Sequence, residues 1–120
     1  MSKKILICDD EEGVRESLKL ILSDYYELIV TDHPEQCLEV VKHSKDDIGV
    51  VLLDIKMPKV NGLELLKAVK EVRPSLPAVM VTGYKSVETA TEATKLGANG
   101  YIIKPFKSEE ILATVKRVMG

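Results

Sequence analysis

A small set of polar residues in this sequence combines the groups that phosphoryl transfer requires. Carboxylates can hold a divalent cation, an ammonium group can pair with an anion, and a hydroxyl group can donate a hydrogen bond to it. Each of these residues directly follows a short apolar run of the chain. They are Asp9 and Asp10 after the first run, Asp54 after the third, Thr82 after the fourth, and Lys104, which precedes Pro105, after the fifth.

The three carboxylates together indicate a bound cation. Taken singly, Asp9 or Asp10 could cap a helix, and Lys104 could pair with any surface acid. Two carboxylates about 4 Å apart, however, repel by roughly 4 kcal/mol at an effective dielectric constant near 20. A cleft that gathers three of them therefore keeps one protonated or binds a cation. Because the ligands are all oxygens, we expect Mg²⁺, which takes few protein ligands and accepts a phosphate oxygen.

The elements that must position these side chains alternate along the chain. Five short apolar runs, mostly continuous and rich in Val and Ile, are typical of strands that are buried on both faces. A segment with helical spacing follows each run, so the sequence predicts an α/β fold with an open parallel sheet covered on both faces. The polar residues then share one sheet edge, at the carboxyl ends of the strands. The runs are Ile5–Cys8, Leu28–Val30, Val50–Leu53, Ala78–Val81 and Tyr101–Ile103.

The helical segments differ in the apolar surface that they can bury. Four carry clear apolar stripes, within residues 14–22, 37–41, 65–72 and 111–119. Pro34 marks the start of the second, and Ser108 is the expected N-cap of the last. The remaining segment, Ser86–Leu96, offers mainly Ala and Thr, so we expect it to be the most weakly held helix. Gly97 is expected to close it.

Length and composition favour one globular domain, residues 1–120. No apolar run could span a bilayer and no signal peptide is recognisable, so we expect a cytoplasmic protein that does not contact a membrane. A net charge of −2 and an aromatic content of 4% argue against direct nucleic-acid binding. Cys8 and Cys37 are expected to be buried free thiols.

Four motifs in combination resemble the receiver domain of bacterial two-component response regulators, particularly the chemotaxis-regulator type. They are the pair Asp9-Asp10, the pattern D-x-x-M-P-x-x-x-G in "DIKMPKVNG" from residue 54, "VMVTGYKS" around Thr82, and K-P-F from residue 104. The resemblance covers the whole chain. It implies a flavodoxin-like sheet with strand order 2-1-3-4-5, and phosphorelay signalling in which a sensor histidine kinase supplies a phosphoryl group from a phosphohistidine.

The resemblance also implies roles for individual residues. Asp54 matches the phosphoacceptor, whose carboxylate attacks phosphorus and forms an acyl phosphate. Asp10, Asp54 and the backbone carbonyl of Lys56 match direct Mg²⁺ ligands, and Asp9 would act through a metal-bound water. Lys104 would pair with Asp54 before phosphorylation and with the phosphoryl group afterwards.

Further residues match the family's conformational switch and its variable positions. The Thr82 hydroxyl would move to the phosphoryl group while Tyr101 rotates inward, and the weakly held fourth helix suits such a switch. The face that changes is formed by the fourth helix, fifth strand and fifth helix. Lys56 and Tyr84 would tune the reaction, and we expect Tyr84 to shield the acyl phosphate from water. The bond before Pro105 is implied to be cis.

Other functions fit parts of this pattern. A flavodoxin would need a Ser/Thr/Gly phosphate loop where this chain has "DDEEG", whose carboxylates repel a phosphate. A phosphatase of the haloacid dehalogenase type would need D-x-D in place of Asp9-Asp10. A degenerate receiver that acts only as an interaction module stays open as the alternative, although every expected functional position is filled.

The resemblance implies partners and a limit on catalysis. The expected partners are a sensor histidine kinase and an output domain or target protein, with a homodimer linked to phosphorylation. The domain is expected to catalyse only transfer to itself and hydrolysis of its own acyl phosphate. On that basis it is not an enzyme that turns over an external substrate.

Overall fold

The computed structural model describes residues 3–44, 47–57 and 59–120, in which strands and helices alternate as the sequence predicts. The strands are β1 (Lys4–Cys8), β2 (Leu28–Thr31), β3 (Ile48–Leu53), β4 (Ala78–Thr82) and β5 (Gly100–Ile103). The helices are α1 (Glu12–Leu22), α2 (Pro34–His43), α3 (Gly62–Val72), α4 (Val87–Lys95) and α5 (Ser108–Met119). Within these ranges, none of the helices is long and apolar enough to cross a membrane.

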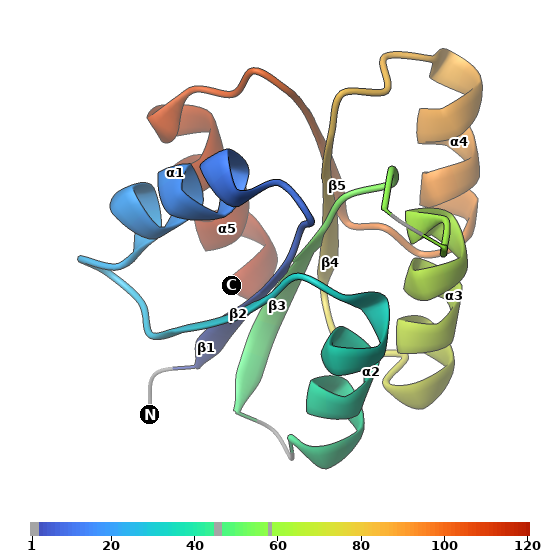
Figure 1. Ribbon diagram of the computed structural model, residues 1–120, viewed down its shortest axis with the longest axis horizontal. Coiled ribbons are helices and arrows are strands. Elements are labelled where there is room, and N and C mark those ends of the chain that lie inside the picture. Colours follow the sequence, from blue (N-terminus) through green and yellow to red (C-terminus); the bar gives the residue numbers. More distant parts are fainter. Residues whose placement is uncertain (1–2, 45–46, 58) are drawn as a thin grey trace.

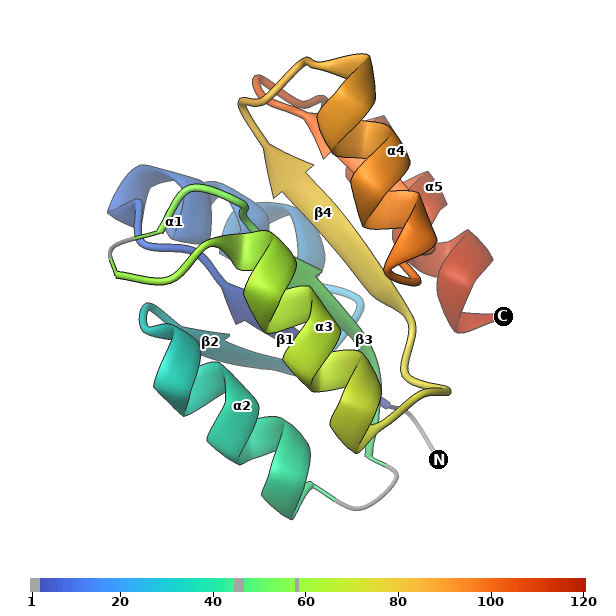
Figure 2. The same cartoon turned by 90° about the vertical axis from the view of Figure 1, so that its right-hand side faces the viewer.

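The strands form one parallel sheet in the order β2-β1-β3-β4-β5, which confirms the flavodoxin-like order that the motifs imply. Figure 1 shows α1 and α5 on one face of this sheet and α2, α3 and α4 on the other. Figure 2 views the molecule from the side of these three helices. Both faces of the sheet are therefore covered.

Two apolar layers hold the helices to the sheet, because successive strand residues point to opposite faces. In β1, Leu6 and Cys8 pack toward α2 and α3, whereas Ile5 and Ile7 pack toward α1 and α5. All the residues of β3 are buried, as the continuous apolar runs predict. Cys8 and Cys37 are buried free thiols, which confirms that expectation.

Helix α4 buries the least apolar surface of the five, as its sequence predicts. Ala93 is its only fully buried residue, and Val87 at its start is 80% exposed. The Ser86 hydroxyl caps the helix by accepting hydrogen bonds from the first-turn amides. Gly97 ends it with φ of +103°, a conformation that favours glycine.

The expected N-cap of the last helix is wrong by one residue. Ser108 is already the first residue of α5, and Lys107 is the N-cap. The carbonyl of Lys107 accepts hydrogen bonds from the amides of Glu110 and Ile111, so the first turn begins one residue earlier than expected. Pro58, which belongs to the third-strand motif, lies outside the described residues.

Candidate functional site

The pairing of β1 with β3 brings the first two acidic positions together. Cys8 lies opposite Leu53 in the ladder, and the amide of Asp54 donates a hydrogen bond to the Cys8 carbonyl at 3.3 Å. Asp9 and Asp54, which directly follow β1 and β3, therefore lie side by side at the same edge of the sheet. Because β1 lies between β2 and β3, strand order reverses here, which is where open α/β sheets bind ligands.

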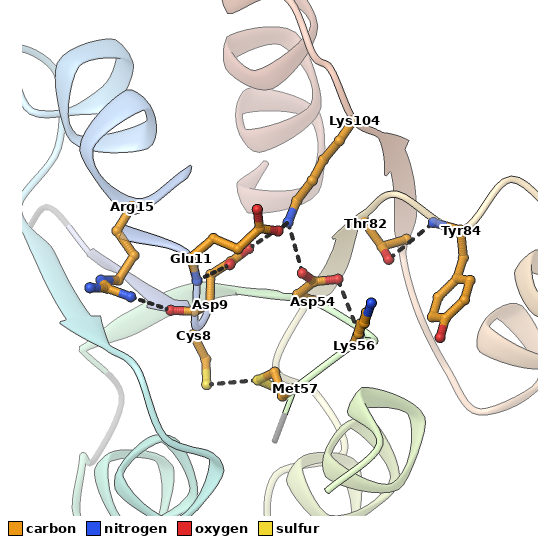
Figure 3. A network of polar contacts seen from close by, with 10 residues as sticks. All are labelled: Cys8, Asp9, Glu11, Arg15, Asp54, Lys56, Met57, Thr82, Tyr84 and Lys104. Carbon is orange, nitrogen blue, oxygen red and sulfur yellow. Dashed lines mark hydrogen bonds and ion pairs between the residues drawn. The ribbon is translucent and has the colours of Figure 1, made fainter. Parts of the chain in front are cut away.

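The pairing of β4 with β5 brings the other two groups to the same edge. Thr82 lies opposite Ile103, and the amide of Lys104 donates to the Thr82 carbonyl at 2.8 Å. The bond between Lys104 and Pro105 is cis, as the motif implied. Figure 3 shows the Lys104 side chain reaching down toward Asp54, with Thr82 on the far side of that carboxylate.

One ammonium group faces three carboxylates in this site. The Nζ atom of Lys104 lies 2.7 Å from Asp54 Oδ2, 3.1 Å from Asp9 Oδ2 and 2.9 Å from Glu11 Oε1. Burial by itself lowers the pKa of Lys104, but its hydrogen bonds to Asp54 and Glu11 and the charge of Asp9 raise that pKa overall. Lys104 is therefore held as a cation. The three carboxylates outnumber this one ammonium group, so the four side chains together keep a surplus of negative charge.

Asp9 is buried and its carboxylate is fully engaged. Its Oδ1 accepts a hydrogen bond from the amide of Glu11 at 2.9 Å, and its backbone carbonyl accepts one from Arg15. Burial raises the pKa of Asp9, although the Glu11 amide and Lys104 oppose that rise. The charged form of Asp9 is thus disfavoured in the folded protein.

We expect Asp9→Asn to stabilise the metal-free protein. The folded chain binds the Asp9 proton at higher pH than the unfolded chain, so the wild-type free energy of unfolding falls as pH rises from about 4 through the raised pKa. Above that pKa the variant avoids the burial of a charge and should therefore be more stable than the wild type. Urea unfolding in EDTA at pH 7 and pH 4 measures this gain, which should shrink at pH 4.

A matched control for this variant is Asp24→Asn, because Asp24 is an exposed carboxylate after α1. It removes the same charge and should leave stability nearly unchanged. An Asp9→Asn protein that is less stable than the wild type at pH 7 would show that Lys104 compensates the buried charge completely.

Asp54 lines an open pocket of about 280 Å³. Its Oδ1 accepts a hydrogen bond from the amide of Lys56 at 3.3 Å, while Lys104 contacts its Oδ2. Its side chain is only 3% exposed. The pocket is lined by Glu11, Asp54, Lys56, Thr82, Gly83, Tyr84 and Lys104.

The two expected switch residues are connected through the backbone of Tyr84. The amide of Tyr84 donates to the buried Thr82 hydroxyl at 3.3 Å, and the Tyr101 hydroxyl donates to the Tyr84 carbonyl at 2.8 Å. Tyr101, in β5, is half-buried against the apolar layer that includes Ala93 of α4, and the Tyr84 side chain is exposed at the pocket rim. A shift of the loop after β4 would therefore reach both residues.

The loop after β3 folds back on the acidic centre. The amide of Gly62 donates to the Ile55 carbonyl at 2.7 Å, and the Asn61 side chain caps α3 by accepting from the amide of Leu63. A Cβ atom on Gly62 would lie 1.9 Å from the Asp54 carbonyl oxygen and 2.6 Å from the Ile55 Cα. Only glycine allows this approach, which the turn pattern of the sequence did not reveal.

The acidic cluster of the structure contains Glu11, which the sequence analysis did not name, and does not contain Asp10, which it expected as a Mg²⁺ ligand. Asp10 is exposed, and among the described residues no hydrogen bond or ion pair holds its carboxylate. Asp9, Glu11 and Asp54 instead each offer an oxygen within 4.8 Å of the others. This all-oxygen set beside a single ammonium group fits Mg²⁺. The spacing of Glu11 two residues after Asp9 was the signal available in the sequence.

The comparisons with known proteins agree with this geometry. A family model described as the response regulator receiver domain matches residues 5–116. Sporulation initiation phosphotransferase F of Bacillus subtilis is 32% identical over 120 residues, covering 99% of this chain and 95% of that protein. The transcriptional regulatory protein ZraR of Escherichia coli is 34% identical over 117 residues, covering 97% of this chain and 26% of that protein.

Solved structures agree as well. A CheY-like receiver domain protein from Methanospirillum hungatei has a TM-score of 0.92 and 32% identity, covering 99% of this chain and 94% of that one. A response regulator from Burkholderia pseudomallei, described with a phosphorylated aspartic acid and a calcium ion, has a TM-score of 0.85 and 28% identity over 95% of this chain and 66% of that one. This chain spans about a quarter of several curated relatives that it matches.

Proposed function

This chain belongs to the response regulator receiver domain family, and we propose that Asp54 is the residue that takes its phosphoryl group. Receiver domains serve phosphorylation-based signalling in two-component systems, and they accept phosphoryl groups. The observation that carries our proposal is the 2.7 Å contact between Lys104 and the buried Asp54 carboxylate, in a pocket that also presents Thr82. The phosphorylated aspartic acid described in the Burkholderia pseudomallei relative supports the same chemistry.

The chain's own groups account for the transfer. An Asp54 oxygen attacks the phosphorus of a phosphohistidine, the P–O bond forms, and the imidazole nitrogen leaves with the electron pair of the P–N bond. Lys104 stays charged throughout, since its pKa is raised, and it offsets the negative charge of the phosphoryl oxygens. The Thr82 hydroxyl can turn and donate to one of them. When bound, Mg²⁺ would neutralise further charge on these oxygens.

We assign the Mg²⁺ ligands to Asp10, Asp54 and the backbone carbonyl of Lys56, with Asp9 acting through a water molecule. The backbone amide of Glu11 holds Asp9 Oδ1 at 2.9 Å, a shorter hydrogen bond than the 3.3 Å bond from the Lys56 amide to Asp54 Oδ1, and this supports the indirect role of Asp9. Asp10 directly follows Asp9 in the chain and is exposed, so its carboxylate is accessible to a metal. Glu11, which the cluster also contains, is a competing candidate for Asp10's place.

Asp10→Ala should therefore weaken Mg²⁺ binding more than Asp9→Ala does, by roughly tenfold or more. A Mg²⁺ titration monitored by the increase in thermal stability compares these variants with Glu11→Gln and with the wild type. If Asp9→Ala or Glu11→Gln weakens Mg²⁺ binding more than Asp10→Ala does, that residue and not Asp10 is the direct ligand.

Intact mass tests the proposed function itself. With Mg²⁺ and a small phosphodonor, the wild type should gain one phosphoryl group, and Asp54→Asn should gain none. A protein with no adduct at all would be the degenerate receiver that acts only as an interaction module. Continued turnover of a phosphoester would instead indicate a phosphatase.

We further propose a partner and an output surface. The phosphoryl source would be a sensor histidine kinase in the cytoplasm, and the domain, residues 1–120, would turn over no external substrate. The surface of α4, β5 and α5 would pass the signal on. It carries the exposed apolar residues Val87 and Ile103, and the Tyr101 hydroxyl ties it to the β4–α4 loop through the Tyr84 carbonyl. Phosphorylation would favour a homodimer or a target protein there.

A further inference from the structure

The Glu11 side chain lies at the start of α1 but does not cap the helix. It occupies the N-cap position, yet its side chain makes no cap hydrogen bond. The Glu11 amide donates to the Asp9 carboxylate, and the Glu11 carbonyl accepts from the Arg15 amide, so the backbone of Glu11 is satisfied without its side chain. The Glu11 carboxylate reaches across to Lys104 Nζ at 2.9 Å, a residue that lies 93 positions further along the chain.

The contact between Glu11 and Lys104 separates two openings in the surface. Both residues line the pocket that contains Asp54. Both also line a second, apolar-walled pocket of about 450 Å³ between the start of α1 and the β5–α5 connection. Figure 3 shows the Glu11 carboxylate directly against the tip of Lys104, above Asp54. A phosphodonor that enters the Asp54 pocket from this side meets the ion pair first.

Glu11 is the one exposed carboxylate among the three that contact Lys104. Its side chain is 59% exposed, whereas those of Asp9 and Asp54 are each 3% exposed. It can therefore swing into solvent, while the other two cannot. An entering phosphoryl group needs the Lys104 ammonium that Glu11 occupies, and it is also repelled by the Glu11 charge.

We infer that Glu11 is a specificity-determining residue, which holds Lys104 in the unphosphorylated state and discriminates against phosphodonors of higher negative charge. This inference rests on the proposed phosphorylation of Asp54. For acetyl phosphate, the Asp54 O–P bond forms while the P–O bond to the acetyl group breaks, and acetate leaves with the electron pair. For phosphoramidate, the P–N bond breaks and ammonia leaves. The first donor is a dianion at neutral pH, and the second is a monoanion.

The test compares phosphorylation rates of Glu11→Gln and wild type with each donor, at saturating Mg²⁺. The variant should react about fourfold faster with acetyl phosphate and only about twofold faster with phosphoramidate. The repulsion energy removed is twice as large for a dianion as for a monoanion, so the rate factor is squared. Glu12→Gln is the matched control: it removes the same charge from the same helical turn, at an exposed residue. Its rates should equal those of the wild type with both donors.

Salt provides a second readout, which a purely structural role of Glu11 would not move. The difference between the donors should shrink at high ionic strength, since screening weakens charge repulsion. Three outcomes would overturn the assignment of Glu11. The variant could react faster by the same factor with both donors, it could react more slowly with either, or the difference between the donors could be independent of salt. An absence of any adduct on the wild type would instead overturn the proposed function, so the two failures are distinguishable.

Discussion

Lys104→Met should slow phosphorylation of Asp54 by roughly a hundredfold, the usual effect of removing one charged group that stabilises a transition state. The ammonium of Lys104 is the cation that contacts Asp9, Glu11 and Asp54 together, at 2.7–3.1 Å. Without it, an entering phosphoryl group meets those carboxylates without the ammonium group that contacts all three. Methionine keeps the length and the apolar stem of the lysine, so the change removes mainly the charge.

The same variant should also be less stable in EDTA, by about 2 kcal/mol, because loss of one partner leaves buried carboxylates uncompensated. Mg²⁺ should restore much of this stability. Phosphorylation rates by intact mass and urea unfolding with and without Mg²⁺ measure both effects. Lys107→Met, in the exposed loop three residues away, is the control. If Lys104→Met and Lys107→Met react equally fast, Lys104 has no role in the transfer.

Gly62→Ala should displace the acceptor loop and destabilise the protein by about 2 kcal/mol or more. The added Cβ would lie 1.9 Å from the Asp54 carbonyl oxygen, which belongs to the backbone and cannot turn aside. The loop or the end of β3 must therefore move. Because a small misplacement of a reacting group is costly, phosphorylation should also slow by roughly tenfold or more.

Gly13→Ala provides the contrast. A Cβ atom at Gly13, inside α1, would meet nothing within 4 Å. Alanine is also the better helix former, so this variant should be as stable as the wild type or more stable by about 0.5 kcal/mol. Thermal unfolding of both variants, with their phosphorylation rates, checks the pair. Equal behaviour of the two would mean that the loop after β3 accommodates a methyl group.

The sequence predicts the fold well because short local patterns of apolar residues indicate which strands are buried. A strand covered on both faces must be continuously apolar, as β1 and β3 are, and the polar residues that follow such strands must meet at one edge. Asp9, Asp54, Thr82 and Lys104 could thus be placed together without any knowledge of side-chain contacts. The low apolar content of α4 likewise predicted its weak attachment.

The remaining features depend on distances that a local pattern does not contain. Glu11 reaches Lys104 only because the start of α1 lies beside the connection between β5 and α5. Glutamates at a helix start are ordinarily solvated. Gly62 looks like a turn residue, yet its backbone contact with Asp54 is what demands glycine. Ser108 is a good N-cap by type, but the backbone of Lys107 begins the helix one residue earlier.

The most direct test of the central claim is to locate the phosphoryl group. Borohydride reduces an aspartyl acyl phosphate to homoserine, so peptide mass spectrometry after phosphorylation and reduction identifies the acceptor. We expect homoserine at position 54 when Mg²⁺ is present and almost none in EDTA. Homoserine at Asp9 or Asp10, or at no aspartate while an adduct is present on the intact protein, would contradict the assignment of Asp54 as phosphoacceptor.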